Sequence, residues 1–144
     1  MADRALVFDF GTRRIGVATA NRQAQTATAL TTIRASDGVP QWREVAALIG
    51  EWQPEVLVFG LPRNADGTDS DMTGRARAFG EWLGERSGLP TQEIDERFTS
   101  AEAEALLREQ RREGSRARRV RPEDIDRMAA VLIAQTWLRS APVP

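Results

Sequence analysis

Four acidic residues of the sequence are candidates for chemistry, and one of them, Asp9, stands in an apolar run where a carboxylate is costly unless it has a partner. Asp9 follows an apolar run, Asp95 and Glu96 end a second strand-like segment, and Asp126 begins an apolar helical face. Carboxylates gathered in one place repel one another unless they share a proton or a cation. Oxygen ligands favour Mg²⁺ or Mn²⁺ over Zn²⁺. We therefore predict a divalent metal site formed by these acids.

Composition limits the other chemistries. The sequence contains no cysteine and no histidine, which excludes thiol catalysis, the usual general base and most zinc sites. Two oxygen-ligated ions about 3.5 to 4 Å apart can activate a water and stabilise the attacking and leaving oxygens of a phosphodiester. The chemistry that fits the acids is therefore hydrolysis of a nucleic-acid backbone.

Each acid also has a simpler structural interpretation. Asp9 could cap the turn at Gly11, and either Asp95 or Glu96 could pair with Arg97 or face solvent. Successive side chains of a strand point to opposite faces, so we expect only one acid of this pair to be a metal ligand. The sequence does not choose between them.

The elements that must position these acids are short strands and helices in alternation. Three runs rich in β-branched and apolar residues follow one another closely, which is typical of an antiparallel meander. Later apolar runs are separated by segments of helical period, and right-handed crossovers make such strands parallel. The predicted strands are 4–10, 14–20, 27–34, 55–62 and 91–98, and the predicted helices are 42–52, 72–83, 99–107 and 122–138.

This order predicts an α/β fold in one domain, residues 1–144. The sheet is mixed, with three antiparallel strands and then two parallel strands, and helices lie on both faces. Asp9 and the pair Asp95 and Glu96 then lie near the carboxyl ends of their strands, where α/β sheets bind ligands. Asp126 shares a helix face with residues that pack on the sheet, so three segments supply carboxylates to one place.

Charge is unevenly distributed along the chain. The formal net charge is −1, yet residues 108–121 contain seven arginines and two glutamates. Such a run is typical of phosphate binding or of a solvated surface. No apolar run approaches the roughly 20 residues that span a bilayer, and the chain does not begin with a signal-peptide pattern. We expect a cytoplasmic protein without a membrane partner.

Four stretches together resemble one protein family. They are DFGTRRIGVA (9–18), FGLPRNADGT (59–68), DERFTSAEA (95–103) and IDRMAAVLIAQTWL (125–138). Their order and spacing resemble the YqgF family, also called RuvX, over nearly the whole chain. The resemblance implies an RNase H-like fold similar to that of Holliday junction resolvases. It also implies a nuclease, dependent on Mg²⁺ or Mn²⁺, that processes the 5′ end of precursor 16S rRNA.

The resemblance implies roles for individual residues. Asp9 matches the first-strand acid expected to bridge the metals, the DER motif matches at residues 95–97, and Asp126 matches the helix acid. Asn64, in the loop after GLP, is expected to contact the substrate, although a turn is the simpler role for this loop. The arginines expected to bind phosphates are Arg13, Arg14, Arg97, Arg111, Arg112, Arg116, Arg118, Arg119 and Arg121.

Three other functions stay open. The first is resolution of four-way DNA junctions, for which symmetric cleavage calls for two active sites and so for a homodimer and not a monomer. The second is a nucleic-acid-binding module without turnover, which acts in ribosome assembly on precursor particles or in transcription. The third is a phosphotransferase or ATPase, because D-x-G-T also begins the phosphate loop of sugar kinases. Those proteins, however, enclose the nucleotide between two such domains.

Overall fold

A six-stranded mixed sheet forms the centre of the molecule. The structure is a computed structural model that describes residues 2–64, 66–95 and 121–140. The sheet has the order β4-β3-β2-β1-β5-β6. Its first four strands pair antiparallel, β5 is parallel to β1, and β6 is parallel to β5. The strands are β1 (Arg4–Asp9), β2 (Arg14–Asn21), β3 (Thr26–Ser36), β4 (Val39–Pro40), β5 (Val56–Leu61) and β6 (Thr91–Asp95). The predicted mixed sheet is confirmed.

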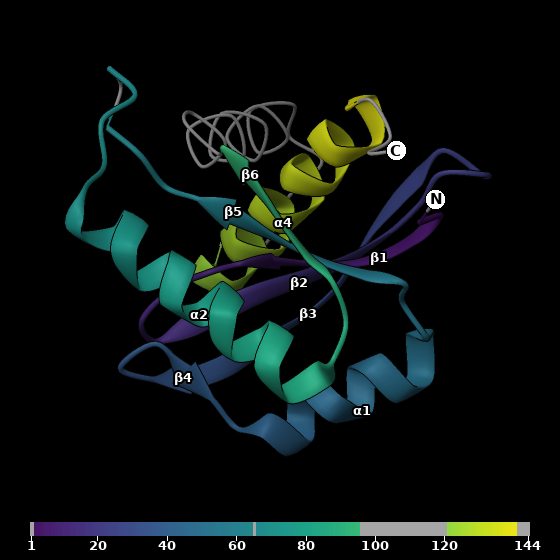
Figure 1. The fold of residues 1–144 in the computed structure, drawn as a ribbon, viewed down its shortest axis with the longest axis horizontal. Coiled ribbons are helices and arrows are strands. Elements are labelled where there is room, and N and C mark those ends of the chain that lie inside the picture. The colour runs from purple at the N-terminus through teal and green to yellow at the C-terminus, as the bar shows by residue number, and fades with distance from the viewer. Residues whose placement is uncertain (1, 65, 96–120, 141–144) are drawn as a thin grey trace.

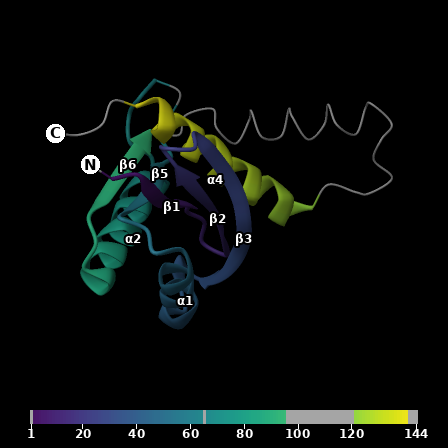
Figure 2. The same cartoon turned by 90° about the vertical axis from the view of Figure 1, so that its right-hand side faces the viewer.

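Helices cover both faces of this sheet, as predicted. Helices α1 (Trp42–Trp52) and α2 (Asp71–Ser87) lie on one face, and α4 (Pro122–Arg139) lies on the other (Figures 1 and 2). The predicted helix 99–107 and the end of the predicted strand 91–98 lie outside the described residues. Among the helices that are described, none is long and apolar enough to cross a membrane.

The short strand β4 was not predicted from the sequence. It pairs with the end of β3 through Ser36 and Val39. The two residues between them, Asp37 and Gly38, have φ values of 51° and 85°. Positive φ at both central residues matches the tight type I′ hairpin turn, for which Asp-Gly is a favoured pair. Asp37 and Gly38 therefore form the hairpin turn that pairs β4 with β3 before α1 begins.

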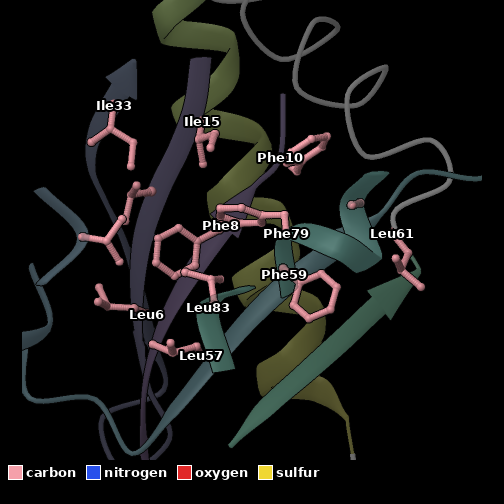
Figure 3. Close-up of a cluster of buried hydrophobic side chains, with 13 residues drawn as sticks. Leu6, Phe8, Phe10, Ile15, Ile33, Leu57, Phe59, Leu61, Phe79 and Leu83 are labelled. Carbon is pink, nitrogen blue, oxygen red and sulfur yellow. The ribbon is translucent and has the colours of Figure 1, made fainter. Parts of the chain in front are cut away.

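The face under α1 and α2 holds the larger apolar cluster, which contains Phe8, Phe10 and Phe79 (Figure 3). The ring of Phe79 on α2 lies 5.8 Å from that of Phe8 and 5.3 Å from that of Phe10, centroid to centroid. These contacts fix the even-numbered residues of β1 on the α2 face. The odd-numbered residues of β1 must therefore face α4.

The face under α4 is built from small residues. Ala5, Val7, Ala18 and Ala20 belong to the cluster that contacts α4. Small side chains let a helix lie close to the sheet, and the closest approach is at Gly16 of β2. A Cβ atom placed on Gly16 would lie 2.1 Å from the backbone oxygen of Asp126. The sequence of β2 therefore fixes where α4 crosses the sheet.

Glu55 ties the start of β1 to the strand beside it. Its Oε1 accepts hydrogen bonds from the backbone N–H groups of Asp3 (3.1 Å) and Arg4 (3.2 Å). These hydrogen bonds lower the pKa of Glu55 from its ordinary value. This contact holds the central strand in register at the end away from Asp9.

Candidate active site

Asp9 is the last residue of β1, the strand between β2 and β5 near the centre of the sheet. Its Cα partner on β2 is Gly16. Because Ala5 and Val7 face α4, strand alternation places the Asp9 side chain on the same face. The residue is partly buried. Asp9 thus lies at the carboxyl end of β1, on the face that α4 covers.

Asp126 reaches the same place from the first turns of α4. The backbone of Asp126 packs directly on Gly16, the residue that pairs with Asp9. The side chain of Asp126 is 21% exposed. Two carboxylates that are far apart in the sequence therefore lie on one face of the sheet, on either side of one glycine.

Arg14 is the partner of Asp126 on the sheet. Its Nε donates a hydrogen bond of 2.9 Å to Oδ2 of Asp126, and its side chain is 38% exposed. Arg14 is the first residue of β2, two residues before Gly16. The ion pair fixes the orientation of the Asp126 carboxylate at the end of the sheet where β1 finishes with Asp9.

Asp95 takes the opposite face. It ends β6 with Leu61 as its Cα partner, and Leu61 belongs to the cluster under α2. Ile94, one residue earlier, belongs to the α4 cluster. Oδ2 of Asp95 lies 3.8 Å from Nε of Arg63. The structure therefore does not bring Asp95 to the face where Asp9 and Asp126 lie, and the other acid of the pair, Glu96, lies outside the described residues.

The loop after β5 is held by its own polar groups. The Asn64 side-chain amide donates to Thr68 Oγ1 (3.0 Å), and Asp66 Oδ1 accepts from the N–H (3.0 Å) and the hydroxyl (2.6 Å) of Thr68. Gly67 has a φ of 89°. Asn64 thus has the turn-forming role, and its predicted contact with nucleic acid stays a prediction.

A basic groove of about 730 Å³ lies beside Asp126. It runs between the start of β2, the end of β3 and the N-terminal turns of α4. Five arginines and two acids contribute to its wall, which is formed by Arg13, Arg14, Thr32, Arg34, Ala35, Arg121, Glu123, Asp124 and Arg127. Arg14 belongs both to this wall and to the ion pair with Asp126. The groove is therefore linked to Asp126 through Arg14.

Three of these arginines were predicted and two were missed. Arg13, Arg14 and Arg121 were expected to bind phosphate, and the structure places them along one groove. Arg34 and Arg127 were not predicted, because each stands alone in a segment dominated by other residue types. The other arginines of the prediction, Arg97, Arg111, Arg112, Arg116, Arg118 and Arg119, lie outside the described residues.

The described residues supply only part of a metal site. Residues 2–64, 66–95 and 121–140 contain no group of three or more acids, histidines or cysteines close enough to hold a metal ion. They do bring Asp9 and Asp126 to one face, each partly buried and each an oxygen donor. The donor chemistry fits a hard divalent cation, with a further ligand still required.

The sheet order and the helices on both faces define an RNase H-like fold. Two solved structures share this fold. Thermus thermophilus RuvC in complex with a Holliday junction substrate matches with a TM-score of 0.52 and 16% identity over 94% of this chain and 95% of that one. The yeast mitochondrial Holliday junction resolvase matches with a TM-score of 0.55 and 13% identity, over 95% of this chain and 78% of that one.

The chain belongs to the RuvX family, described as Holliday junction resolvase, which it matches over residues 3–140. A relative from Chromohalobacter salexigens is 47% identical over 92% of this chain and 86% of its own length. Another from Dechloromonas aromatica is 47% identical over 94% of this chain and 90% of its own length. Both are provisionally named pre-16S rRNA nuclease. The predicted family is confirmed, and these names support a nuclease.

Proposed function

We propose that this chain is a divalent-metal-dependent endonuclease that hydrolyses phosphodiester bonds in nucleic acid. One observation carries the proposal: Asp9 pairs with Gly16 and the backbone of Asp126 packs on the same glycine, near a groove lined by five arginines. Carboxylates suit a hard cation, and guanidinium groups suit phosphate oxygens. A nuclease of this kind needs both, at adjoining places.

Mg²⁺ or Mn²⁺ is the cation that the donors suit best, because the chain offers carboxylates and no histidine or cysteine. We assign Asp9 and Asp126 as two of its ligands. When bound, the cation would activate a water for attack on phosphorus and stabilise the leaving oxygen. The two carboxylates would hold it at the carboxyl end of β1.

We assign Glu96 as the further ligand in preference to Asp95. Asp95 shares a face with Leu61 and lies near Arg63, away from Asp126. Because neighbouring residues of a strand alternate in direction, the expectation from the sequence was that one acid of this pair is a ligand. The position of Asp95 on the α2 face therefore favours Glu96 as the further metal ligand.

Arg14 would both orient a metal-binding carboxylate and bind a phosphate of the substrate. Its Nε bonds to Asp126, which fixes the orientation of a metal-binding carboxylate. Its guanidinium also lines the groove, where its other N–H groups are donors for a phosphate oxygen. Arg14 would therefore position the nucleic-acid backbone relative to the acids.

The substrate that we propose is structured RNA, in the processing of the 5′ end of precursor 16S rRNA in the cytoplasm. The names of the two relatives support RNA. The family description and the junction complex of the RuvC structure support a four-way DNA junction as the second candidate. Either substrate presents a phosphodiester backbone to the same arginines.

A cleavage assay on both substrates tests the proposal. Wild-type protein and Asp9→Asn are incubated with a precursor 16S leader RNA and with a four-way DNA junction, with Mg²⁺, with Mn²⁺ and with chelator. We expect divalent-dependent cutting of the RNA by the wild type, and a loss of about 10²-fold or more in Asp9→Asn, the scale of a lost transition-state contact.

The outcomes separate the candidate functions. Junction cutting without RNA cutting would favour a resolvase. Tight binding of either substrate without any cutting would favour a binding module. Equal cutting by wild type and Asp9→Asn would contradict the assigned site.

A further inference from the structure

Arg34 and Arg14 stand directly opposite each other on β3 and β2. The backbone N–H of Ala35 donates to the carbonyl oxygen of Arg13 at 2.8 Å. Arg14 and Arg34 therefore form the adjacent non-hydrogen-bonded pair, in which opposite side chains approach most closely. Like charges directly opposite on a sheet repel. Asp126 balances the charge of Arg14, so the charge of Arg34 is the one that the pair leaves without an anion among the described residues.

Both side chains face α4. Gly16, two residues after Arg14, packs on Asp126. Thr32, two residues before Arg34, donates its hydroxyl to the backbone oxygen of Glu123 on α4 (3.3 Å). Strand alternation places Arg14 and Arg34 on that same face, and both line the basic groove.

The charges of the groove are only partly balanced. Arg14 is paired with Asp126 at 2.9 Å, and Arg127 is paired with Asp124 at 2.6 Å. Within the described part of the chain, the structure gives no ion pair for Arg34 or Arg13, and both residues are exposed. Arg121, on the α4 side of the groove, likewise has no ion pair among the described residues, whereas Arg13 and Arg34 lie together at the end formed by β2 and β3.

We infer that Arg34 and Arg13 form a phosphate-binding subsite that holds a nucleic-acid backbone beside the two acids. The subsite rests on the proposed function, since it would bind a phosphate that flanks the cleaved one. A phosphate there would balance the charges of Arg13 and Arg34, as Asp126 balances that of Arg14. Arg14 lies opposite Arg34 and bonds to Asp126, so a strand bound at the subsite would lie close to the cleavage site.

The test compares Arg34→Gln, Arg34→Lys and wild type, with Arg43→Gln as the matched control. Arg43 is an exposed arginine on α1, which covers the other face of the sheet. Binding of the labelled leader RNA and of the labelled junction is measured in chelator by fluorescence anisotropy over a salt series. Divalent-dependent cleavage is measured in parallel, and thermal melting checks that each variant is folded.

For Arg34→Gln we expect Kd to rise about tenfold, the scale of one charge-assisted hydrogen bond. The slope of log Kd against log salt falls by about one. KM rises and kcat stays unchanged, because Arg34 does not touch the reacting atoms. Arg34→Lys keeps the salt slope, and Arg43→Gln behaves as wild type.

If Arg34→Gln binds with the Kd and salt slope of the wild type while the wild type cleaves, the subsite is wrong and the proposed function stands. If the wild type binds with the expected dependence on Arg34 but cuts nothing, the subsite stands and the endonuclease is wrong. Equal weakening by Arg34→Gln and Arg43→Gln would overturn the subsite, because it would show a diffuse charge effect.

Discussion

Ile94 determines on which face of the sheet the described acids of β6 lie. Its side chain packs in the cluster under α4 and is 9% exposed. Its neighbours Glu93 and Asp95 must then point to the α2 face, where Glu93 lies 3.8 Å from Arg77 and Asp95 lies 3.8 Å from Arg63. One buried isoleucine therefore places both described acids of this segment on the α2 face.

This placement gives a prediction for the pair of adjacent acids. Asp95→Asn should retain most of the divalent-dependent cleavage, because the lost charge lies near Arg63 and not near Asp126. Glu96→Gln should lose about 10²-fold or more. Initial cleavage rates at saturating substrate measure both. The reverse order of effects would show that Asp95 is the ligand.

Helix α4 and strand β2 are the elements that bring the acids together. The helix lies on a surface of small residues, and Gly16 leaves room for its backbone. The other end of α4 is held by Trp137, which is 1% exposed and whose Nε1 donates to Gln92 on β6 (3.0 Å). Arg22 lies over the Trp137 ring, 4.0 Å from its centroid. Contacts at both ends thus fix where Asp126 sits along β2.

The substitution Gly16→Ala should disturb the packing of α4 on β2. The added methyl group would lie 2.1 Å from the Asp126 backbone oxygen, so α4 must shift. We expect a loss of roughly 1 to 3 kcal/mol in the free energy of unfolding, the usual cost of overpacking. The cleavage rate should also fall by more than the fraction of protein that is unfolded, because the shift of α4 moves Asp126. Chemical denaturation and cleavage rates measure the two effects.

Gly50→Ala is the control for this substitution. Gly50 lies on α1, and a Cβ atom there would meet nothing within 4 Å. Alanine in a helix is more stable than glycine by roughly 0.5 to 1 kcal/mol, so this variant should be at least as stable as the wild type. Equal stability of Gly16→Ala and wild type would contradict the close approach of α4.

At the scale of the whole molecule, the order of layers was predictable and the pairing across strands was not. Apolar period and turn residues predicted the mixed sheet, the crossovers and the last helix. The position of Asp9 at the carboxyl end of the central strand follows from that topology. These features depend on local patterns, which a single sequence contains.

The place of Arg34 in the groove could not be predicted from local sequence patterns. Arg34 lies in the predicted strand 27–34, but its neighbour across the sheet depends on the register of β2 and β3. That register shifts at a bulge between Val17 and Ala18, for which the sequence carries no clear signal. Arg127 was missed because its contribution depends on where α4 crosses the sheet. The groove is a product of tertiary packing.

The claim that Asp126 acts with Asp9 in divalent-dependent cleavage is tested by the activity of Asp126→Asn. We measure its initial rate of cleavage of the leader RNA in Mg²⁺ or Mn²⁺, with Glu93→Gln as the control. Glu93 is an acid on the α2 face of β6. We expect Asp126→Asn to lose about 10²-fold or more while it stays folded and binds RNA, and Glu93→Gln to cleave as the wild type does. Cleavage by Asp126→Asn at the wild-type rate would contradict the claim.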